Sequence, residues 1–215
     1  MTWRLAVIGV LGSSLSSFAC SKQTSSYFPL SEGRTWKYEA HDVSLVHGEL
    51  TASVTVTNMR PRELKGRRTT PRKQIIETNG QTMTVLEYMV EDTTGVYSIA
   101  GQSGFDADPT IGQPKYLFQL PLKVGTTWSD PFTLQFVPGQ ARIEELNSVV
   151  DVPAGSFSNC LKVRVTPIPP PLANQRGSDA EALLWYAPSV GLVKVIQRRP
   201  IGKGRYSLQL VSFTR

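Results

Sequence analysis

The stretch Thr51-Ala52-Ser53-Val54-Thr55-Val56-Thr57 alternates apolar and hydroxyl side chains without a break. A period of two residues puts one set on each face of an extended strand, so that one face is buried and the other is in water. The same alternation returns in residues 132–136, 161–165 and 206–210. The pattern predicts antiparallel strands that each bury one side.

Turn signals separate these stretches at short intervals. Asn79-Gly80, Thr94-Gly95 and Val190-Gly191 place glycine where a tight turn needs a left-handed backbone. Residues 178–186 are the one short helix that the sequence predicts, because no longer stretch keeps a period of 3.6 residues. We therefore expect an all-β domain with little helix.

One motif occurs twice in the chain. Pro29-Leu30-x-x-Gly33-x-Thr35-Trp36 returns 92 residues later as Pro121-Leu122-x-x-Gly125-x-Thr127-Trp128. Each copy is interpreted as a turn that leads into a strand, with its tryptophan as a core anchor; a ligand platform is the alternative role for the two rings. The repetition indicates either two related halves or one motif used twice.

The N-terminal residues are typical of a secretory signal that ends in a lipidation site. Arg4 precedes an apolar run over residues 5–12, and Phe18-Ala19-Cys20 is similar to a lipobox. We expect cleavage before Cys20, lipidation of that residue and attachment to the membrane through the lipid. Ser17 stands where a lipobox usually has leucine, so plain secretion is the alternative. The predicted organisation is a signal peptide over 1–19, a flexible tether over 20–26 and a single β domain over 27–215.

Three further blocks carry a resemblance to a known family. They are Tyr27-Phe28-Pro29-Leu30-x-x-Gly33-x-x-Trp36-x-Tyr38, Val152-Pro153-Ala154-Gly155-x-Phe157-x-Asn159-Cys160-Leu161-x-Val163 and Trp185-Tyr186-Ala187-Pro188-x-Val190-Gly191-Leu192-Val193-Lys194. In these blocks the chain resembles the TapB-like family of uncharacterised bacterial lipoproteins, whose fold is similar to that of the lipoprotein carriers LolA and LolB. The resemblance implies an antiparallel curved sheet that forms a half-barrel or incomplete barrel, and it brings no catalytic residues. Ser189 departs from the family pattern, which has glycine there.

The sequence lacks the motifs of the common enzyme classes. Neither of the two histidines belongs to an HExxH helix, and no GxSxG elbow, GxGxxG fingerprint or P-loop is present. Adjacent Glu144 and Glu145 are expected on opposite faces of a strand, where they cannot act together as an acid and a base. Cys160 has no partner at metal-ligand spacing and is expected to pack as an apolar side chain. The interpretation is a protein that is not an enzyme and that uses no cofactor and no metal ion.

Positive charge concentrates in residues 60–73. Seven basic residues there face one acidic residue, an excess equal to the formal net charge of +6 for the whole chain. One interpretation is a solvated hairpin tip. The other is contact with an anionic surface such as lipid head groups, for which the candidate residues are Arg67, Arg68, Arg72 and Lys73. Nucleic acid is not an expected partner, because no aromatic side chains are interleaved with the basic ones.

A curved sheet of this kind has a concave apolar face, which either packs on itself as plain core or holds an apolar ligand. Strand parity offers five candidate residues for that face: Phe118, Phe136, Val163, Trp185 and Leu208. The leading hypothesis is a non-catalytic lipoprotein of the cell envelope, lipid-anchored in the outer membrane and facing the periplasm, that binds a lipid, an acyl chain or a peptide. The alternative is a structural accessory subunit that binds envelope proteins through exposed sheet edges or the basic segment.

Overall fold

The computed structural model of this chain describes residues 27–44, 48–104, 107–129, 131, 139–167, 180–198 and 204–214. Nearly all regular structure in these ranges is β-strand. The predicted signal peptide, Cys20 and the predicted tether lie outside the described residues, as do Phe136 and the strand predicted over residues 132–136.

The described part of the chain contains 13 strands in one sheet. They are β1 (Thr35–Ser44), β2 (Gly48–Asn58), β3 (Arg62–Leu64), β4 (Arg67–Thr78), β5 (Gln81–Asp92), β6 (Gly95–Ser103), β7 (Thr110–Gln119), β8 (Thr127–Ser129), β9 (Gly139–Val152), β10 (Gly155–Pro167), β11 (Glu181–Ala187), β12 (Gly191–Arg198) and β13 (Arg205–Phe213). The alternating stretches over residues 51–57, 161–165 and 206–210 lie within β2, β10 and β13. These three strand predictions are therefore confirmed.

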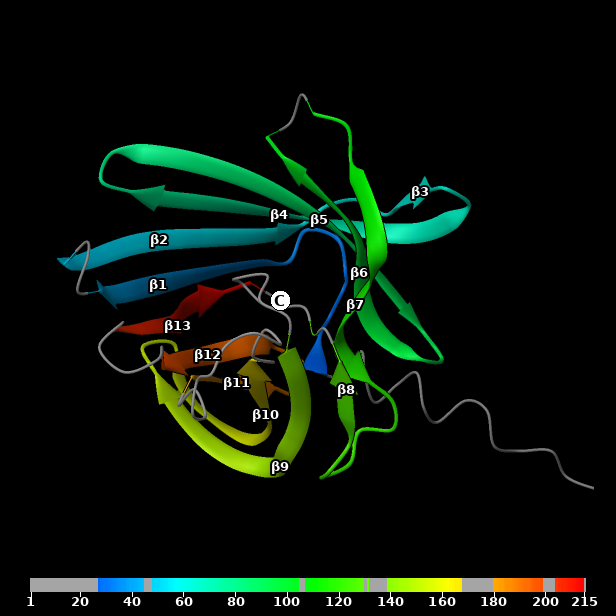
Figure 1. The fold of residues 1–215 in the computed structure, drawn as a ribbon. Coiled ribbons are helices and arrows are strands. Elements are labelled where there is room, and N and C mark those ends of the chain that lie inside the picture. Colours follow the sequence, from blue (N-terminus) through cyan, green and yellow to red (C-terminus); the bar gives the residue numbers. More distant parts are fainter. Residues whose placement is uncertain are drawn as a thin grey trace, which may run out of the picture.

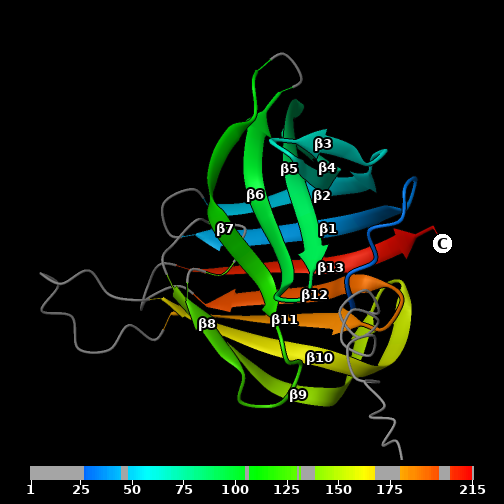
Figure 2. The same cartoon turned by 90° about the vertical axis from the view of Figure 1, so that its right-hand side faces the viewer.

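All neighbouring strands of the sheet are antiparallel. The order is β7-β6-β5-β4-β2-β1-β13-β12-β11-β10-β9-β8, and β3 pairs with β4 beside this path. The sheet curls until its edge strands β7 and β8 approach each other (Figures 1 and 2). Trp128 Nε1 of β8 donates a hydrogen bond across this seam to the Tyr116 carbonyl oxygen of β7 at 3.1 Å, but no ladder joins the two strands in the described ranges. The fold is a nearly closed barrel with one unsealed seam, which confirms the predicted incomplete barrel.

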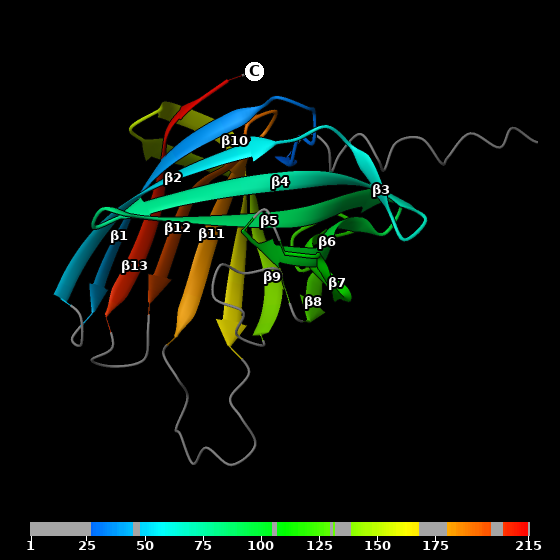
Figure 3. The ribbon, with the colours of Figure 1, turned by 90° about the horizontal axis from the view of Figure 1, so that it is seen from above.

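Each half of the chain contributes a consecutive set of strands to this barrel. One half supplies β1, β2 and β4 to β7, and the other supplies β8 to β13. The halves are joined by the ladder between β1 and β13 on one side and face each other across the seam on the other. Seen from above, β4 and β5 run across the direction of β11 and β12 (Figure 3). The interior therefore lies between the two halves.

The repeated motif begins the first strand of each half. Gly33 N donates to Asn58 O at 2.9 Å, and Gly125 N donates in the same way to Ile143 O at 2.9 Å. In both copies the acceptor belongs to the strand that follows along the chain. Both glycines have a left-handed backbone, with φ of 81° and 92°. The predicted turn that leads into a strand is thus confirmed for both copies.

The two tryptophans of the motif are core anchors. Trp36 is 1% exposed and Trp128 is 5% exposed. Trp36 Nε1 donates to Val190 O at 2.6 Å, much as Trp128 Nε1 donates to Tyr116 O. A buried indole whose N–H is satisfied contributes its full apolar area to the core.

A second, smaller apolar cluster lies on the outer face of the sheet, over β5 and β6. The hairpin formed by β3 and β4 covers it, because Leu64 packs against the cluster and the Arg62 guanidinium lies 4.8 Å from the Tyr88 ring centroid. This cover explains why the middle of β5 is buried on both faces.

The helix predicted over residues 178–186 is wrong, because Glu181–Ala187 form strand β11. Leu184 of β11 pairs with Val163 on one side and with Val195 on the other. Two cross-strand neighbours outweigh a weak helical pattern, since strand preference depends mainly on packing context. Ser189, in the turn after β11, has a φ of 61°. The glycine that the resemblance predicts at position 189 would adopt this left-handed backbone conformation without strain.

Candidate binding cavity

A cavity of about 180 Å³ lies in the barrel interior between the two halves. Most of its wall is apolar. The aliphatic lining residues that β2, β7, β11, β12 and β13 supply include Val54, Val56, Leu117, Leu184, Leu192 and Leu208. The alternation read from β2 and β13 explains this wall, since every second residue of these strands points inward. Phe28, which precedes β1, also contributes its ring.

Three polar side chains enter the same cavity from two neighbouring strands. Arg72 and Gln74 come from β4 and Glu87 comes from β5. Each is at most 9% exposed. Arg72 and Glu87 are direct cross-strand partners in the register of the two strands. Charged side chains are almost never buried to this degree without a partner.

Although Arg72 and Glu87 are opposite each other in the register, Glu87 is hydrogen-bonded to Gln74. Glu87 Oε2 accepts from Gln74 Nε2 at 2.9 Å. The Arg72 guanidinium carbon lies 4.4 Å from the Phe28 ring centroid and 5.0 Å from the Trp36 ring centroid. Arg72 also bonds to the Tyr38 hydroxyl. It makes no ion pair with any carboxylate of the described residues.

Burial shifts the protonation of the groups around the cavity. It raises the pKa of Glu87 to about 7, although the nearby Arg72 charge opposes the shift. It lowers the pKa of Arg72, which Tyr38 and Glu87 oppose. Burial also raises the pKa of Tyr38 to about 12 and raises the pKa of Tyr186 strongly. At neutral pH the cavity therefore has neutral tyrosines, a cationic Arg72 and a Glu87 carboxyl near its midpoint.

Burial of the Arg72 charge costs free energy. A buried ion costs several kcal/mol of lost hydration unless an opposite charge and hydrogen bonds replace the water. A cation over an aromatic ring returns about 2 kcal/mol when it is desolvated. Among the described residues, the five guanidinium N–H donors of Arg72 face two aromatic rings and the Tyr38 hydroxyl rather than a carboxylate in an ion pair.

A second hollow of about 560 Å³ borders the cavity at Glu87. Residues of β5, β6 and β7 line it, among them Ile99 and Lys115. Because both hollows share the Glu87 side chain, the carboxyl lies at the boundary between them.

The structure places the five residues predicted from strand parity in different surroundings. Leu208 lines the cavity. Phe118 and Val163 are core residues, 0% and 2% exposed, and the Phe118 ring lies 4.6 Å from that of Tyr186 in an edge-on contact. Trp185 lies on the other face of β11, with Lys162 Nζ 5.9 Å from its ring centroid. Phe136 lies outside the described residues.

The residues proposed for contact with an anionic surface also separate. Arg67 and Arg68 begin β4 directly after the tight turn at Lys65 and Gly66, and both are exposed. Lys73 is half-buried. The guanidinium of Arg72 lies inside the barrel, so a role at the outer surface does not fit its position.

Sequence reasoning missed the polar groups of the cavity. Ile76 faces inward, and parity from it would have placed Gln74 and Arg72 inward as well. Ile75, on the opposite face of β4, is equally apolar, so these two residues do not show which face of the strand points inward. Arg72 was instead assigned to the basic segment over residues 60–73.

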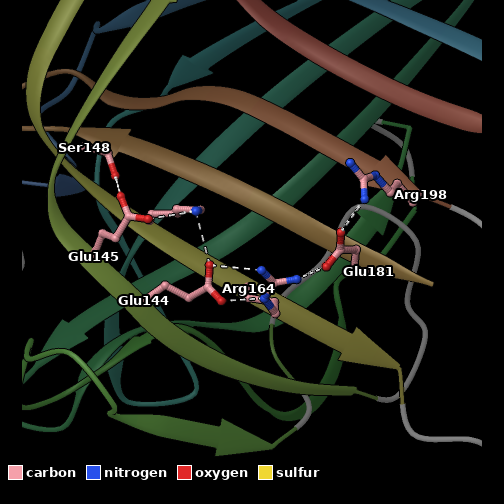
Figure 4. A network of polar contacts seen from close by, with 7 residues as sticks. Glu144, Glu145, Ser148, Arg164, Glu181 and Arg198 are labelled. Atoms are coloured by element: carbon pink, nitrogen blue, oxygen red, sulfur yellow. Dashed lines mark hydrogen bonds and ion pairs between the residues drawn. The ribbon is translucent and has the colours of Figure 1, made fainter. Parts of the chain in front are cut away.

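A network of ion pairs covers the outer face of β9 to β12 (Figure 4). Lys162 Nζ lies 3.3 Å from Glu144 Oε2 and 2.9 Å from Glu145 Oε1. The prediction that these two glutamates point to opposite faces is therefore wrong, because the register between β9 and β10 shifts at this point and brings both to one lysine. Arg164 continues the network from Glu144 to Glu181, which also pairs with Arg198.

Cys160 is fully buried and free, as predicted, and burial raises the pKa of its thiol to about 11. A thiol in this state is neutral at physiological pH and is a poor nucleophile or metal ligand. Within the described ranges no three metal-binding side chains gather at one place. No helix of the described chain has the length and hydropathy of a bilayer span.

No protein-family model matches the chain, and no curated protein matches its sequence. The resemblance to the TapB-like family therefore stays a prediction. Among solved structures, a candidate exported protein with a YmcC-like fold from Bacteroides fragilis is similar with a TM-score of 0.49 and 14% identity, over 88% of this chain and 99% of that chain. A candidate lipoprotein from Parabacteroides distasonis is similar with a TM-score of 0.43 and 13% identity, over 87% of this chain and 98% of that chain.

Proposed function

We propose that the β domain is a non-catalytic binding protein that holds a small apolar ligand in the cavity between its two halves. The observation that carries this proposal is the cavity itself, because protein interiors are otherwise packed with few voids larger than a water molecule. An apolar wall with a few convergent polar groups is the usual composition of a ligand site. The cavity of about 180 Å³ has that composition.

The size of the cavity limits the class of ligand. Binding sites for drug-sized molecules are commonly about 300–1,000 Å³. The cavity here, of about 180 Å³, lies below this range. This favours one short or medium acyl chain, and it disfavours the several chains of a whole lipoprotein anchor such as the LolA and LolB carriers hold.

The test is a calorimetric titration of the purified, delipidated protein with decanol. We expect one decanol to bind per chain. Leu208→Trp fills the cavity from β13 and should weaken binding at least tenfold, whereas Val149→Trp, at a site 68% exposed on β9, should leave it unchanged. Thermal melts show whether both variants remain folded. If neither decanol nor decanoate binds to the parent protein, the proposed function is wrong.

The proposed setting is the cell envelope, with the domain anchored by a lipid on Cys20 in the outer membrane and facing the periplasm. The signal segment and the lipobox-like Ala19-Cys20 support this setting. Exposed Arg67 and Arg68 at the β3–β4 turn would then be available to anionic head groups.

A structural accessory subunit remains the second candidate function, and one observation favours it. β7 is an edge strand that pairs only with β6 among the described residues, and its first five residues are exposed. An open strand edge is a template for a strand from a partner protein. A stoichiometric partner crosslinked to β7 in a pull-down would support this function, and its loss on Ile111→Pro would locate the contact.

A further inference from the structure

Arg72 is a buried cation that faces an apolar cavity, and no carboxylate of the described residues forms an ion pair with it. Its cross-strand partner Glu87 is directly opposite, yet the Glu87 carboxylate is bound by Gln74 and the guanidinium lies on the Phe28 and Trp36 rings. The two groups therefore interact through the low-dielectric interior without forming an ion pair. This arrangement leaves the guanidinium available to another anion.

The remaining polar groups of the cavity fit the same anion. Tyr38 and Tyr186 are neutral hydroxyl groups that line the cavity beside Arg72. Arg72 is the one cationic side chain in the described lining, so the cavity offers a single positive charge. A singly charged planar carboxylate matches a guanidinium in charge and geometry, whereas a doubly charged phosphate would keep an excess negative charge.

We propose that the ligand of this cavity is an amphiphile with one carboxylate, of the fatty-acid class, whose head group pairs with Arg72 while its alkyl chain lies along Val54, Leu184 and Leu208. This inference rests on the proposed function, because it names the chemical class of the ligand for that cavity. Apolar walls supply the affinity for the chain, and the buried cation discriminates an acid from the corresponding alcohol.

Glu87 makes this binding depend on pH. A bound carboxylate adds a second negative charge near the Glu87 carboxyl, so binding and ionisation of Glu87 oppose each other. The groups that face Glu87 are Arg72 and Gln74 of β4 and Lys115 of β7. Affinity for the acid should therefore fall as the pH rises through about 7, where Glu87 ionises. Affinity for a neutral alcohol should not change.

The experiment compares decanoate, decanol and decyl phosphate by calorimetry with the whole protein from pH 6 to pH 9. We expect decanoate to bind at least tenfold more tightly than decanol at pH 6. Arg72→Gln should remove this preference and keep the affinity for decanol. Arg62→Gln is the matched control, because Arg62 also stacks on an aromatic ring but outside the cavity, and it should keep the preference.

Glu87→Gln gives a second test that does not depend on whether the Arg72 variant folds. It should bind decanoate more tightly than the parent does at pH 8, and the fall of affinity with pH should disappear. Equal affinity of the parent for decanoate and decanol would overturn the carboxylate inference and leave the proposed function standing. Tighter binding of decyl phosphate than of decanoate would also overturn it. Binding of none of the three would overturn both.

Discussion

At the residue scale, Glu87 shows how burial turns an ordinary carboxyl into a group that responds near neutral pH. Its folded-state pKa of about 7 lies above the ordinary value of 4.5 because the side chain is buried. The folded protein therefore binds this proton more tightly than the unfolded chain. The resulting stabilisation is fully present below about pH 4.5 and is lost as the pH rises through about 7.

Glu87→Gln should remove this loss of stability. The difference between the two pKa values corresponds to about 3 kcal/mol at most, so the free energy of unfolding of the parent should fall by up to that amount between pH 4.5 and pH 7 relative to the variant. Urea denaturation across this pH range measures it.

Glu145→Gln is the control for this prediction. Hydrogen bonds from Ser148 and Lys162 lower the pKa of Glu145, so its contribution is present above the ordinary value and is lost only as the pH falls through the lowered one. Between pH 4.5 and pH 7 the free energy of unfolding of this variant should depend on pH as that of the parent does, with at most a constant offset. If the free energy of unfolding depends on pH in the same way for the parent and for Glu87→Gln, the pKa of the Glu87 carboxyl is not raised.

Ser189 departs from the family pattern at a position where the backbone conformation favours glycine. The resemblance puts glycine at this position, and the structure gives the serine a φ of 61°. A left-handed conformation costs a non-glycine residue about 1–2 kcal/mol. The turn keeps its place nonetheless, because Arg34 Nη2 donates to the Ser189 carbonyl oxygen at 2.6 Å and Trp36 Nε1 to the next one along the chain.

At the scale of strands, the sequence predicts best where one face is buried and the other is exposed. β2, β10 and β13 alternate clearly, and a stretch within each of them was predicted from that period alone. β5 was not predicted because the β3–β4 hairpin covers its outer face and removes the alternation. β11 was taken for a helix because its apolar residues cluster, but pairing with β10 on one side and β12 on the other makes it a strand.

The candidate site was harder to predict than the strands. Leu208, one of the candidates from strand parity, lines the cavity, but the burial of Arg72, Gln74 and Glu87 was not predicted. Their burial arises from the closure of the sheet, which brings β4 and β5 opposite β11 and β13. Closure of the sheet depends on strands that are far apart in the sequence, so the local alternation of residues does not predict it.

The turn between β5 and β6 illustrates how one glycine permits close approach of two strands. Gly95 has a φ of 146°, and a Cβ atom there would overlap the Phe118 carbonyl oxygen of β7. We expect Gly95→Ala to lower the free energy of unfolding by at least about 3 kcal/mol, since β7 must move to make room. Chemical denaturation measures the change.

Gly80→Ala is the matched variant for this prediction. Gly80 also has a positive φ, of 74°, but no atom lies within 4 Å of a Cβ built on it. Only the backbone strain remains, which costs about 1–2 kcal/mol. Equal losses for the two glycines would mean that the contact with β7 is not what Gly95 serves.

At the scale of the whole molecule, the two halves are arranged alike around the interior. Each begins with the repeated motif, and each starts its fifth strand with a glycine of positive φ, Gly95 for β6 and Gly191 for β12. Leu120 N, just before the second motif, donates to Thr94 O beside Gly95, and Pro29 of the first motif packs at Gly191. The beginning of each half thus packs on the equivalent turn of the other, which favours two related halves over one motif used twice.

The two junctions between these halves differ in strength, and hydrogen exchange should report the difference. A ladder from Trp36 to Val43, with a register shift between Lys37 and Tyr38, joins β1 to β13. At the seam, the described residues show the hydrogen bond from Trp128 Nε1 to Tyr116 O and no ladder. Trp128→Phe removes that bond and keeps most of the buried ring. A hydrogen bond contributes about 1 kcal/mol, so exchange of the amides of β8 and the end of β7 should accelerate roughly fivefold.

Trp36→Phe removes the equivalent indole bond, to Val190 O, but the ladder between β1 and β13 remains. Amide exchange in these two strands should then change by less than about twofold, because backbone pairing holds the junction independently of the indole. Mass spectrometry of peptides from the two junctions distinguishes the cases. Similar acceleration at both junctions would mean that the seam is held as firmly as the ladder. Acceleration confined to β7 and β8 would identify the seam as the place where the barrel opens first.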